Sequence, residues 1–197
     1  LPALPALYPY APSSVAASAA STTSATINWN AAAGATSYQV YRSSLNGSFA
    51  LVGTSATPTY NDTPLSANTT YLYKVRAVAG AVVSPLSAVD ATTTTVFTND
   101  PLVVASTTIK AAHIVELRTA VNAMRAAGGL SAQTFTDNPL SAGTKIKAVH
   151  LQQLRTALDQ ARAAIGLSAL AYTDATITPG ATKPKAAHVI ELRNGVK

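Results

Sequence analysis

The sequence predicts an antiparallel β-sandwich followed by a small helical domain that is built from three repeated units. Three observations support this prediction. Alternating apolar and polar residues recur at roughly 8–12-residue spacing in the first half of the chain. Helical periodicity replaces that alternation in the second half, and one sequence segment occurs there three times. The 197 residues are long enough for two domains of ordinary size.

The composition favours a folded extracellular or cell-surface protein and excludes several kinds of site. Hydrophobic residues make up 48% of the chain, whereas charged residues make up 11%, against about 25% in an average soluble domain. Cysteine is absent, so disulfides, thiolate metal sites and cysteine nucleophiles are excluded. No apolar run reaches the roughly 18 residues that a membrane-spanning helix needs.

The net charge of +6 is concentrated in the second half of the chain. Residues 1–95 carry three basic and two acidic side chains, and residues 96–197 carry eleven and six. This asymmetry predicts two different modules. The basic residues are not densely clustered with aromatic stacking positions, so we expect no nucleic-acid partner.

Residues 1–11 form a proline-rich N-terminal arm. Each proline fixes φ and removes a backbone donor, so we expect an extended segment. The arm is either a tether or an assembly segment that adds to a neighbouring surface, such as a sheet edge. Its candidate assembly contacts are Leu4, Leu7, Tyr8 and Tyr10.

Residues 12–95 are expected to form the sandwich. The predicted strands are a first one that opens at Val15, then 25–29, 38–42, 49–52 and 71–78, and a last one over 82–89 that Pro85 interrupts. Short strands without helical periodicity are typical of an antiparallel sandwich. Tyr38 and Tyr41 have opposite parity in their strand, so one of them points outward, either as an ordinary surface residue or as part of a carbohydrate-binding surface.

Several residues of this half resemble a fibronectin type III domain. They are the single tryptophan, Trp29, the strand over 37–42, Leu65 placed six residues before Tyr71, and the late segments 84–87 and 91–93. The resemblance covers about residues 12–94. It implies a seven-stranded sandwich that serves as a spacer, an adhesion module or a partner-binding module. It also implies that Trp29, Leu65 and Tyr71 are core and corner residues, not ligand contacts.

Residues 96–197 contain a threefold repeat. Residues 110–118 return as 147–155 and 185–193, and each copy follows a short segment that we call a hook, with an aromatic residue, a threonine, and Asn or Asp. The hooks are 97–99, 135–137 and 172–174. The expected units, each an extended arm leading from a hook into an amphipathic helix, are about 97–134, 135–171 and 172–197.

Each predicted helix carries a histidine on one edge of its apolar stripe and an arginine on the other. We expect structural roles, with the histidine bonding the backbone of a neighbouring hook and the arginine clamping the next unit. A polyanion-binding role for the arginine edges is an alternative. The repeated positions are His113, Arg118, His150, Arg155, His188 and Arg193.

The repeat does not match known catalytic or metal patterns. The zinc pattern needs two histidines one turn apart, whereas each unit has one, and Gln153 replaces the glutamate of the other two units. A hook offers one or two oxygen ligands, and calcium requires six to eight. We therefore expect no catalytic residue, no metal site and no cofactor, and no enzymatic activity of the chain itself.

The repeats resemble uncharacterised helical repeats at the C-termini of secreted bacterial proteins, which implies an extracellular location. Two hypotheses for the function follow. The first is a non-enzymatic structural or adhesive module that contacts other copies or a cell-surface partner and self-assembles into a filament or layer. It rests on the N-terminal arm and on a repeat array without an obvious cap. The second is an accessory carbohydrate-binding region of a larger secreted hydrolase, with polysaccharide as its partner.

Overall fold

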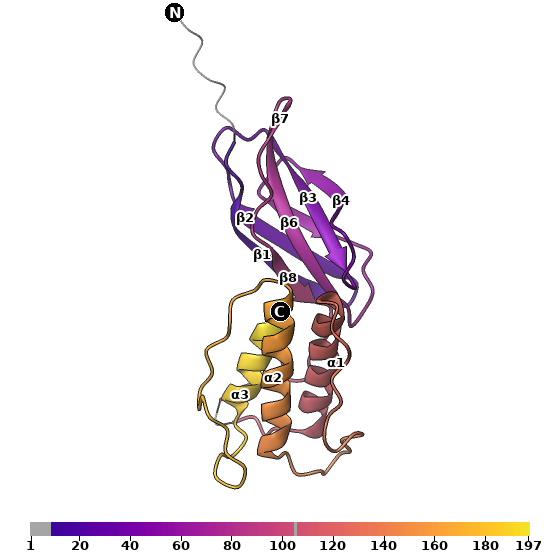
Figure 1. Cartoon of the computed structure of the whole chain (residues 1–197), viewed down its shortest axis with the longest axis vertical. Helices are drawn as coiled ribbons and strands as arrows, with labels where there is room; N and C mark the ends of the chain where they lie inside the picture. The colour runs from indigo at the N-terminus through magenta and orange to yellow at the C-terminus, as the bar shows by residue number, and fades with distance from the viewer. Residues whose placement is uncertain (1–8, 105) are drawn as a thin grey trace, which may run out of the picture.

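The structure, a computed structural model, describes residues 9–104 and 106–197 and consists of a β-sandwich that stands on the ends of three helices (Figure 1). Leu4, Leu7 and Tyr8 of the expected assembly arm lie outside the described residues. Tyr10 lies within them and is exposed. The predicted fold class, a sandwich followed by three helices, is confirmed.

The sandwich has two antiparallel sheets. One contains β1 (Ser13–Ser21), β2 (Ser24–Asn30) and β5 (Thr59–Asp62) in the order β1-β2-β5. The other has β3 (Ser37–Ser44) between β4 (Ala50–Ser55) and β6 (Thr70–Ala79), and β7 (Val82–Val83) and β8 (Asp90–Thr93) both pair with β6. The short strand β5 was not among the predicted strands.

The sandwich has eight strands, not the seven that the resemblance implied, and the last predicted strand, 82–89, has wrong bounds. Of that range, β7 covers Val82–Val83 alone, and β8 begins after it, at Asp90. Between them Ser84 and Ser87 still bond to β6, where their backbone N–H groups donate to the carbonyls of Ala77 and Val75. Their hydroxyls accept the N–H groups of the same two residues. The segment around Pro85 thus follows β6 with serine hydroxyls in place of carbonyl acceptors, and the proline stands at the edge of the sheet, where its missing N–H is tolerated.

Alternating side chains of the two sheets fill the sandwich core. Trp29 of β2 and Tyr38 of β3 meet edge to face, with ring centroids 5.2 Å apart. The hydroxyl of Tyr71 accepts the backbone N–H of Ser66 at 2.8 Å beside buried Leu65, so this tyrosine fixes the turn before β6. Such aromatic pairs and satisfied hydroxyls determine how the two sheets pack.

The three helices are α1 (Ala111–Ala127), α2 (Ala148–Ala164) and α3 (Ala186–Val196). Each helix packs against the other two. Their C-terminal ends point toward the sandwich and their N-terminal ends point away from it (Figure 1). The buried positions follow the predicted helical spacing, as in Ile114, Leu117 and Val121.

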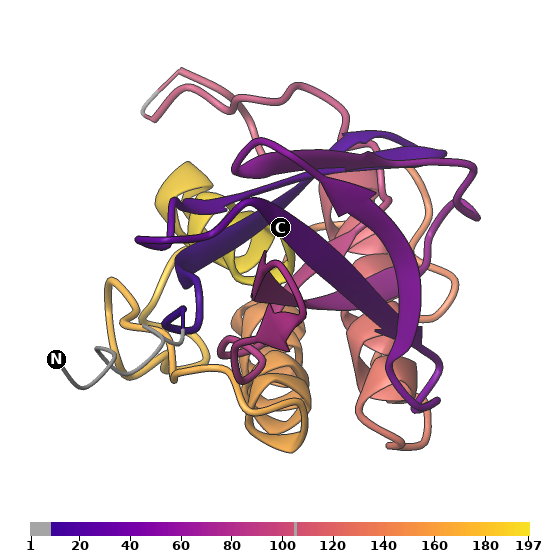
Figure 2. The same ribbon diagram turned by 90° about the horizontal axis from the view of Figure 1, so that it is seen from above.

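One hydrophobic core joins the helices to the lower end of the sandwich. Leu72 of β6 and Ala91 of β8 belong to the same buried cluster as the helical side chains, and Phe49 and Val89 pack against it. Figure 2, which looks down from above, shows the sandwich lying over the helix ends. Because this core is shared, the sandwich and the helices are not two independently packed domains.

Candidate functional surfaces

The arginine of each helix binds the hook of the next unit. The Arg118 guanidinium donates to the carbonyl oxygens of Thr136 at 2.6 Å and Asp137 at 3.0 Å. Arg155 does the same to Thr173 at 2.7 Å and Asp174 at 2.8 Å. Two parallel bonds to adjacent carbonyls exploit the forked geometry that distinguishes arginine from lysine.

Arg193 of the last helix binds the hook of the first unit. It donates to the carbonyls of Thr98 at 2.8 Å and Asn99 at 3.1 Å, and its side chain is almost fully buried. The three units therefore form a closed ring, which we call the helical ring. The expectation of a repeat array without a cap is wrong, because α3, although it has 11 residues against 17 in α1, includes the arginine that closes the ring.

Each of these arginines also stacks on the aromatic residue of the hook that it binds. Guanidinium carbons lie 5.0 Å, 4.3 Å and 4.8 Å from the ring centroids in the pairs Arg118–Phe135, Arg155–Tyr172 and Arg193–Phe97. Stacking covers the flat face of the cation while its edge donates to carbonyls. The aromatic start of each hook thus has a definite partner.

Each histidine fixes the hook of its own unit through a side chain, which corrects the expected bond to a neighbouring hook's backbone. His150 Nδ1 accepts the Lys147 backbone N–H, so its Nε2 carries the proton that faces Asp137 Oδ2 at 3.0 Å. The hook residue has a positive φ of 53°, which turns its side chain back toward the helix start. The other units repeat this with His113 and Asn99, and with His188 and Asp174.

Glu116 and Glu191 have a role that the sequence analysis missed. The Glu191 carboxylate accepts the Thr173 N–H at 2.9 Å and lies 3.3 Å from the Arg155 guanidinium. It thereby ties its own hook to the arginine of the preceding unit. Gln153 keeps the bonds to Thr136 but brings no charge to Arg118. The recurrence of glutamate, or glutamine in the second unit, three positions after each histidine was the available signal.

The repeated histidines and arginines of the helical ring are held in structural contacts. The three histidines are fully buried, and none of their recorded hydrogen bonds goes to a serine or threonine hydroxyl that could act as a nucleophile. Within residues 9–104 and 106–197, no group of three His, Cys, Asp or Glu side chains is arranged to hold a metal ion. In the same ranges, no helix has the length and apolar character that crossing a membrane requires.

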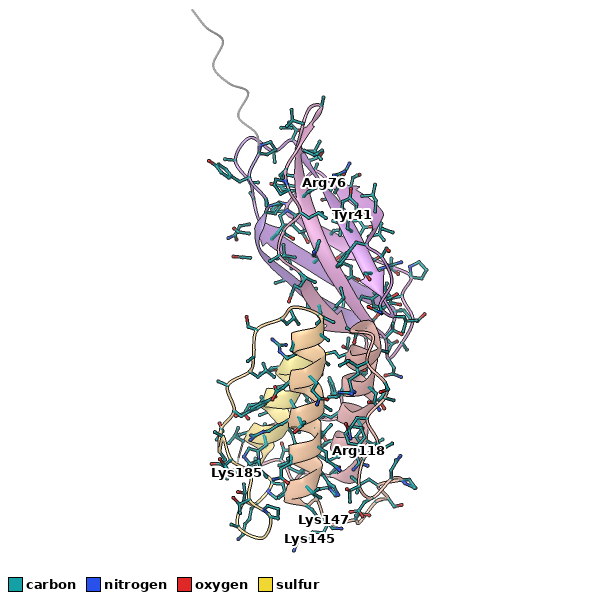
Figure 3. All side chains as sticks on the ribbon, viewed as in Figure 1. Tyr41, Arg76, Arg118, Lys145, Lys147 and Lys185 are labelled. Carbon is teal, nitrogen blue, oxygen red and sulfur yellow. The ribbon has the colours of Figure 1, made fainter. Side chains whose placement is uncertain are left out.

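The outer face of the larger sheet carries a polar and aromatic patch. Tyr38 is the core tyrosine, and Tyr41 points outward beside Arg76, whose guanidinium lies 5.1 Å from the ring centroid (Figure 3). Gln39 joins the two, because its Oε1 accepts from the Arg76 Nε at 2.7 Å and from the Tyr41 hydroxyl at 3.1 Å. This arrangement holds one aromatic ring in a fixed orientation at the surface.

A cavity of about 640 Å³, the distal cavity, lies at the end of the helical ring that is remote from the sandwich. The arms of all three units line it, and they contribute Thr108, Ile146 and Lys185 among others. Lys145 lines the cavity as well, and Figure 3 shows both lysines at that end of the molecule. A second hollow, of about 340 Å³, lies where Phe97, Asp100 and Lys197 meet β1.

A family model for the fibronectin type III domain matches residues 10–93. Residues 10–93 form a fibronectin type III domain. The resemblance that Trp29, Leu65 and Tyr71 suggested is therefore confirmed, and all three side chains are buried in this domain. The match ends at the last residue of β8, where the hooks and helices begin.

Two curated relatives match stretches of 90 residues. A poly(3-hydroxybutyrate) depolymerase of Ralstonia pickettii is 44% identical over 45% of this chain and 17% of its own length. Exoglucanase B of Cellulomonas fimi is 39% identical over 43% of this chain and 8% of its own length. The chain thus covers less than a fifth of either relative.

Among solved structures, a Fn3-like protein from Clostridium thermocellum is 34% identical, with a TM-score of 0.40 over 43% of this chain and 91% of that chain.

Proposed function

We propose that this chain is a non-catalytic accessory region of a larger extracellular hydrolase, and that it contacts the polymer on which that hydrolase acts. The observation that carries the proposal is the pair of relatives, a poly(3-hydroxybutyrate) depolymerase and an exoglucanase, at 44% and 39% identity. The match is about as long as the fibronectin type III domain, and it is a small part of both relatives. This favours a shared accessory domain over a shared catalytic one.

Two structural features support an accessory role. The core shared by the sandwich and the helices makes the chain a stiff spacer, because bending at the junction would expose Leu72 and Phe49. The patch around Tyr41 presents an aromatic ring and amphipathic neighbours on a flat sheet face, which suits contact with the surface of an insoluble polymer.

Retention on insoluble polymer tests the proposal. The purified chain is mixed with poly(3-hydroxybutyrate) granules or with cellulose, and the fraction removed by centrifugation is measured. We expect retention on at least one polymer, with Tyr41→Ala reducing it several-fold. Tyr10→Ala removes an exposed tyrosine elsewhere and should have no effect. A chain that stays in solution with both polymers would refute polymer contact.

A self-assembling structural module is the second candidate. The described part of the N-terminal arm favours it, since Tyr10 is 77% exposed beside β1, an edge strand of its sheet. The other argument for self-assembly was a repeat array without a cap, and the closed ring removes that argument. Deleting residues 1–11 should convert assemblies into folded monomers in analytical ultracentrifugation. If the intact chain already sediments as a monomer at high concentration, this candidate is excluded.

A further inference from the structure

We propose that the distal cavity of the helical ring binds a carboxylated polysaccharide. This site lies in the helical half, at the end opposite to the fibronectin type III domain (Figures 1 and 3). The proposal does not depend on the accessory role argued above, which concerns the sandwich and insoluble polymers.

The cavity has the size and lining of a ligand site. Its volume of about 640 Å³ falls within the roughly 300–1,000 Å³ typical of ligand pockets. Threonine hydroxyls on two arms, Thr108 and Thr144, alternate with the apolar side chains of Ile109 and Ile146. Hydroxyl groups next to small apolar surfaces match the hydroxyls and C–H faces of a sugar.

The charges at this end of the ring do not cancel. Five lysines occupy the arms and helix starts, and two of them, Lys147 and Lys185, pair with Asp137 and Asp174 at 2.7 Å and 2.6 Å. Within the described residues, no ion pair or side-chain hydrogen bond is recorded for the ammonium groups of the remaining three, which are Lys110, Lys145 and Lys183. Of these three, Lys145 lines the cavity, and Lys110 and Lys183 each neighbour a lining residue in sequence, Ile109 and Pro184. The lysine charge at this end therefore exceeds the aspartate charge, which favours an anionic ligand.

The helix direction adds to this potential. The first turn of α3, with Ala186 and Ala187, lines the cavity, and none of the three helices has an acidic residue in its first turn to offset the partial positive charge there. Partial positive charge at helix starts strengthens the attraction that the lysines already exert on an anion.

The lining selects a carboxylated polysaccharide among anionic polymers. Single-stranded nucleic acids bind to aromatic platforms and arginines, and the cavity lining includes neither. Acidic peptide motifs are recognised by clusters of arginine, and the described residues of the lining include no arginine. Lysine, a flexible point charge, suits carboxylates that recur along a polymer without a fixed bidentate geometry.

Titration calorimetry with polygalacturonate tests the proposal on the intact chain. Fully methyl-esterified polygalacturonate is the neutral ligand with the same backbone. We expect binding to the acid form alone, weakened by raising the salt concentration, since exposed charges are screened. The variant Lys145→Gln/Lys183→Gln should weaken binding about 5- to 10-fold, because each exposed lysine contributes up to ~1 kcal/mol.

The matched control is Lys74→Gln/Lys197→Gln, which removes the same net charge from the sandwich and from the other end of the ring. It should change the affinity less than twofold. Equal loss in both variants, binding of the ester, or tighter binding of poly-glutamate or single-stranded DNA would each overturn the proposal. Both variants should keep the melting temperature of the unchanged chain, which shows that weaker binding does not result from loss of folding. Retention on insoluble polymers is a separate measurement, so either proposal can fail without the other.

Discussion

The sandwich and the helical ring use different chemical groups to hold their successive elements in register. In the sandwich, backbone ladders such as that between β3 and β6 align the strands, and apolar side chains fill the core. In the ring, helices use their own backbone groups internally, so the units are joined by buried guanidinium groups that bind hook carbonyls. The comparison teaches that buried charge specifies register where backbone pairing is not available.

Opening the ring gives the largest expected effect. Arg193→Ala removes an almost fully buried guanidinium that pairs with the Glu116 carboxylate and donates to the carbonyls of Thr98 and Asn99. Losing one partner of such a buried pair costs about 3–5 kcal/mol. Urea denaturation should show this loss in the free energy of unfolding. Lys197→Ala removes an exposed cation four residues away as the control, and a comparable loss there would contradict the specific role of Arg193.

The sandwich contains one buried charged group for comparison, Asp62. It accepts the Tyr73 hydroxyl at 2.8 Å and pairs with Arg42 at 2.9 Å. Burial, with the nearby Asp62 charge, raises the pKa of Tyr73, so the phenol stays a donor throughout the ordinary pH range. Tyr73→Phe should lower stability by about 1.5–3 kcal/mol, the usual value for a hydrogen bond to a charged group. Tyr41→Phe, which alters an outward hydroxyl, should cost much less in the same denaturation assay.

Acid should weaken the ring before the sandwich. All three histidines lie in the ring, and burial, followed by the Arg193 charge, lowers the pKa of His113 below its ordinary value of about 6.5. A lowered folded-state pKa means that the unfolded chain takes up the proton first as the pH falls. The stability is therefore full above about pH 6.5 and declines below it.

Hydrogen exchange at pH 7.0 and pH 5.5, corrected for intrinsic rates, checks this order. Amides of α1 should lose protection at pH 5.5 while those of β3 and β6 keep it. Asn99→Asp supplies a carboxylate to His113 Nε2, which raises the pKa of that histidine and should reduce the loss. Equal loss of protection in both halves would show that the histidines do not determine the acid response.

The smallest expected effect concerns the one unit without a glutamate. Gln153→Glu would place a carboxylate near Arg118, as Glu191 does for Arg155 and Glu116 for Arg193 at 3.3 Å each. The Thr136 hydroxyl can turn to donate, as Thr98 does to Glu116. A gain of up to ~1 kcal/mol at low salt is expected in thermal unfolding. The gain should shrink in 1 M salt, and a gain that persists there would indicate packing instead of charge.

Residue patterns predicted the fold class because the two periodicities differ clearly. Alternation over 71–78 and the spacing of Leu151, Leu154 and Leu158 each identify one face of an element, and the fibronectin type III resemblance rests on a few buried aromatic and aliphatic residues. The bounds of β7 and β8 escaped prediction, because the segment between them bonds to β6 through the Ser84 and Ser87 hydroxyls in place of backbone acceptors.

The polar contacts of the ring were harder to predict than its helices. Repetition indicated that each arginine meets another unit, but closure by Arg193 depends on how far each unit is rotated from the last, which no local pattern encodes. The target of the histidines was wrong for a local reason. The positive φ at Asp137 returns the hook side chain to its own helix, and this follows from backbone conformation instead of sequence spacing.

Closure of the ring also changes what chain order means for the helical half. The arginine of each unit donates to the same two hook carbonyls of the next unit around the ring, and Lys197 reaches Asp100 just past the first hook at 2.6 Å. A cyclic structure of this kind has no privileged beginning. Circular permutation that starts the helical half at its second or third hook would retain every arginine–hook contact, and only the attachment to the sandwich would move.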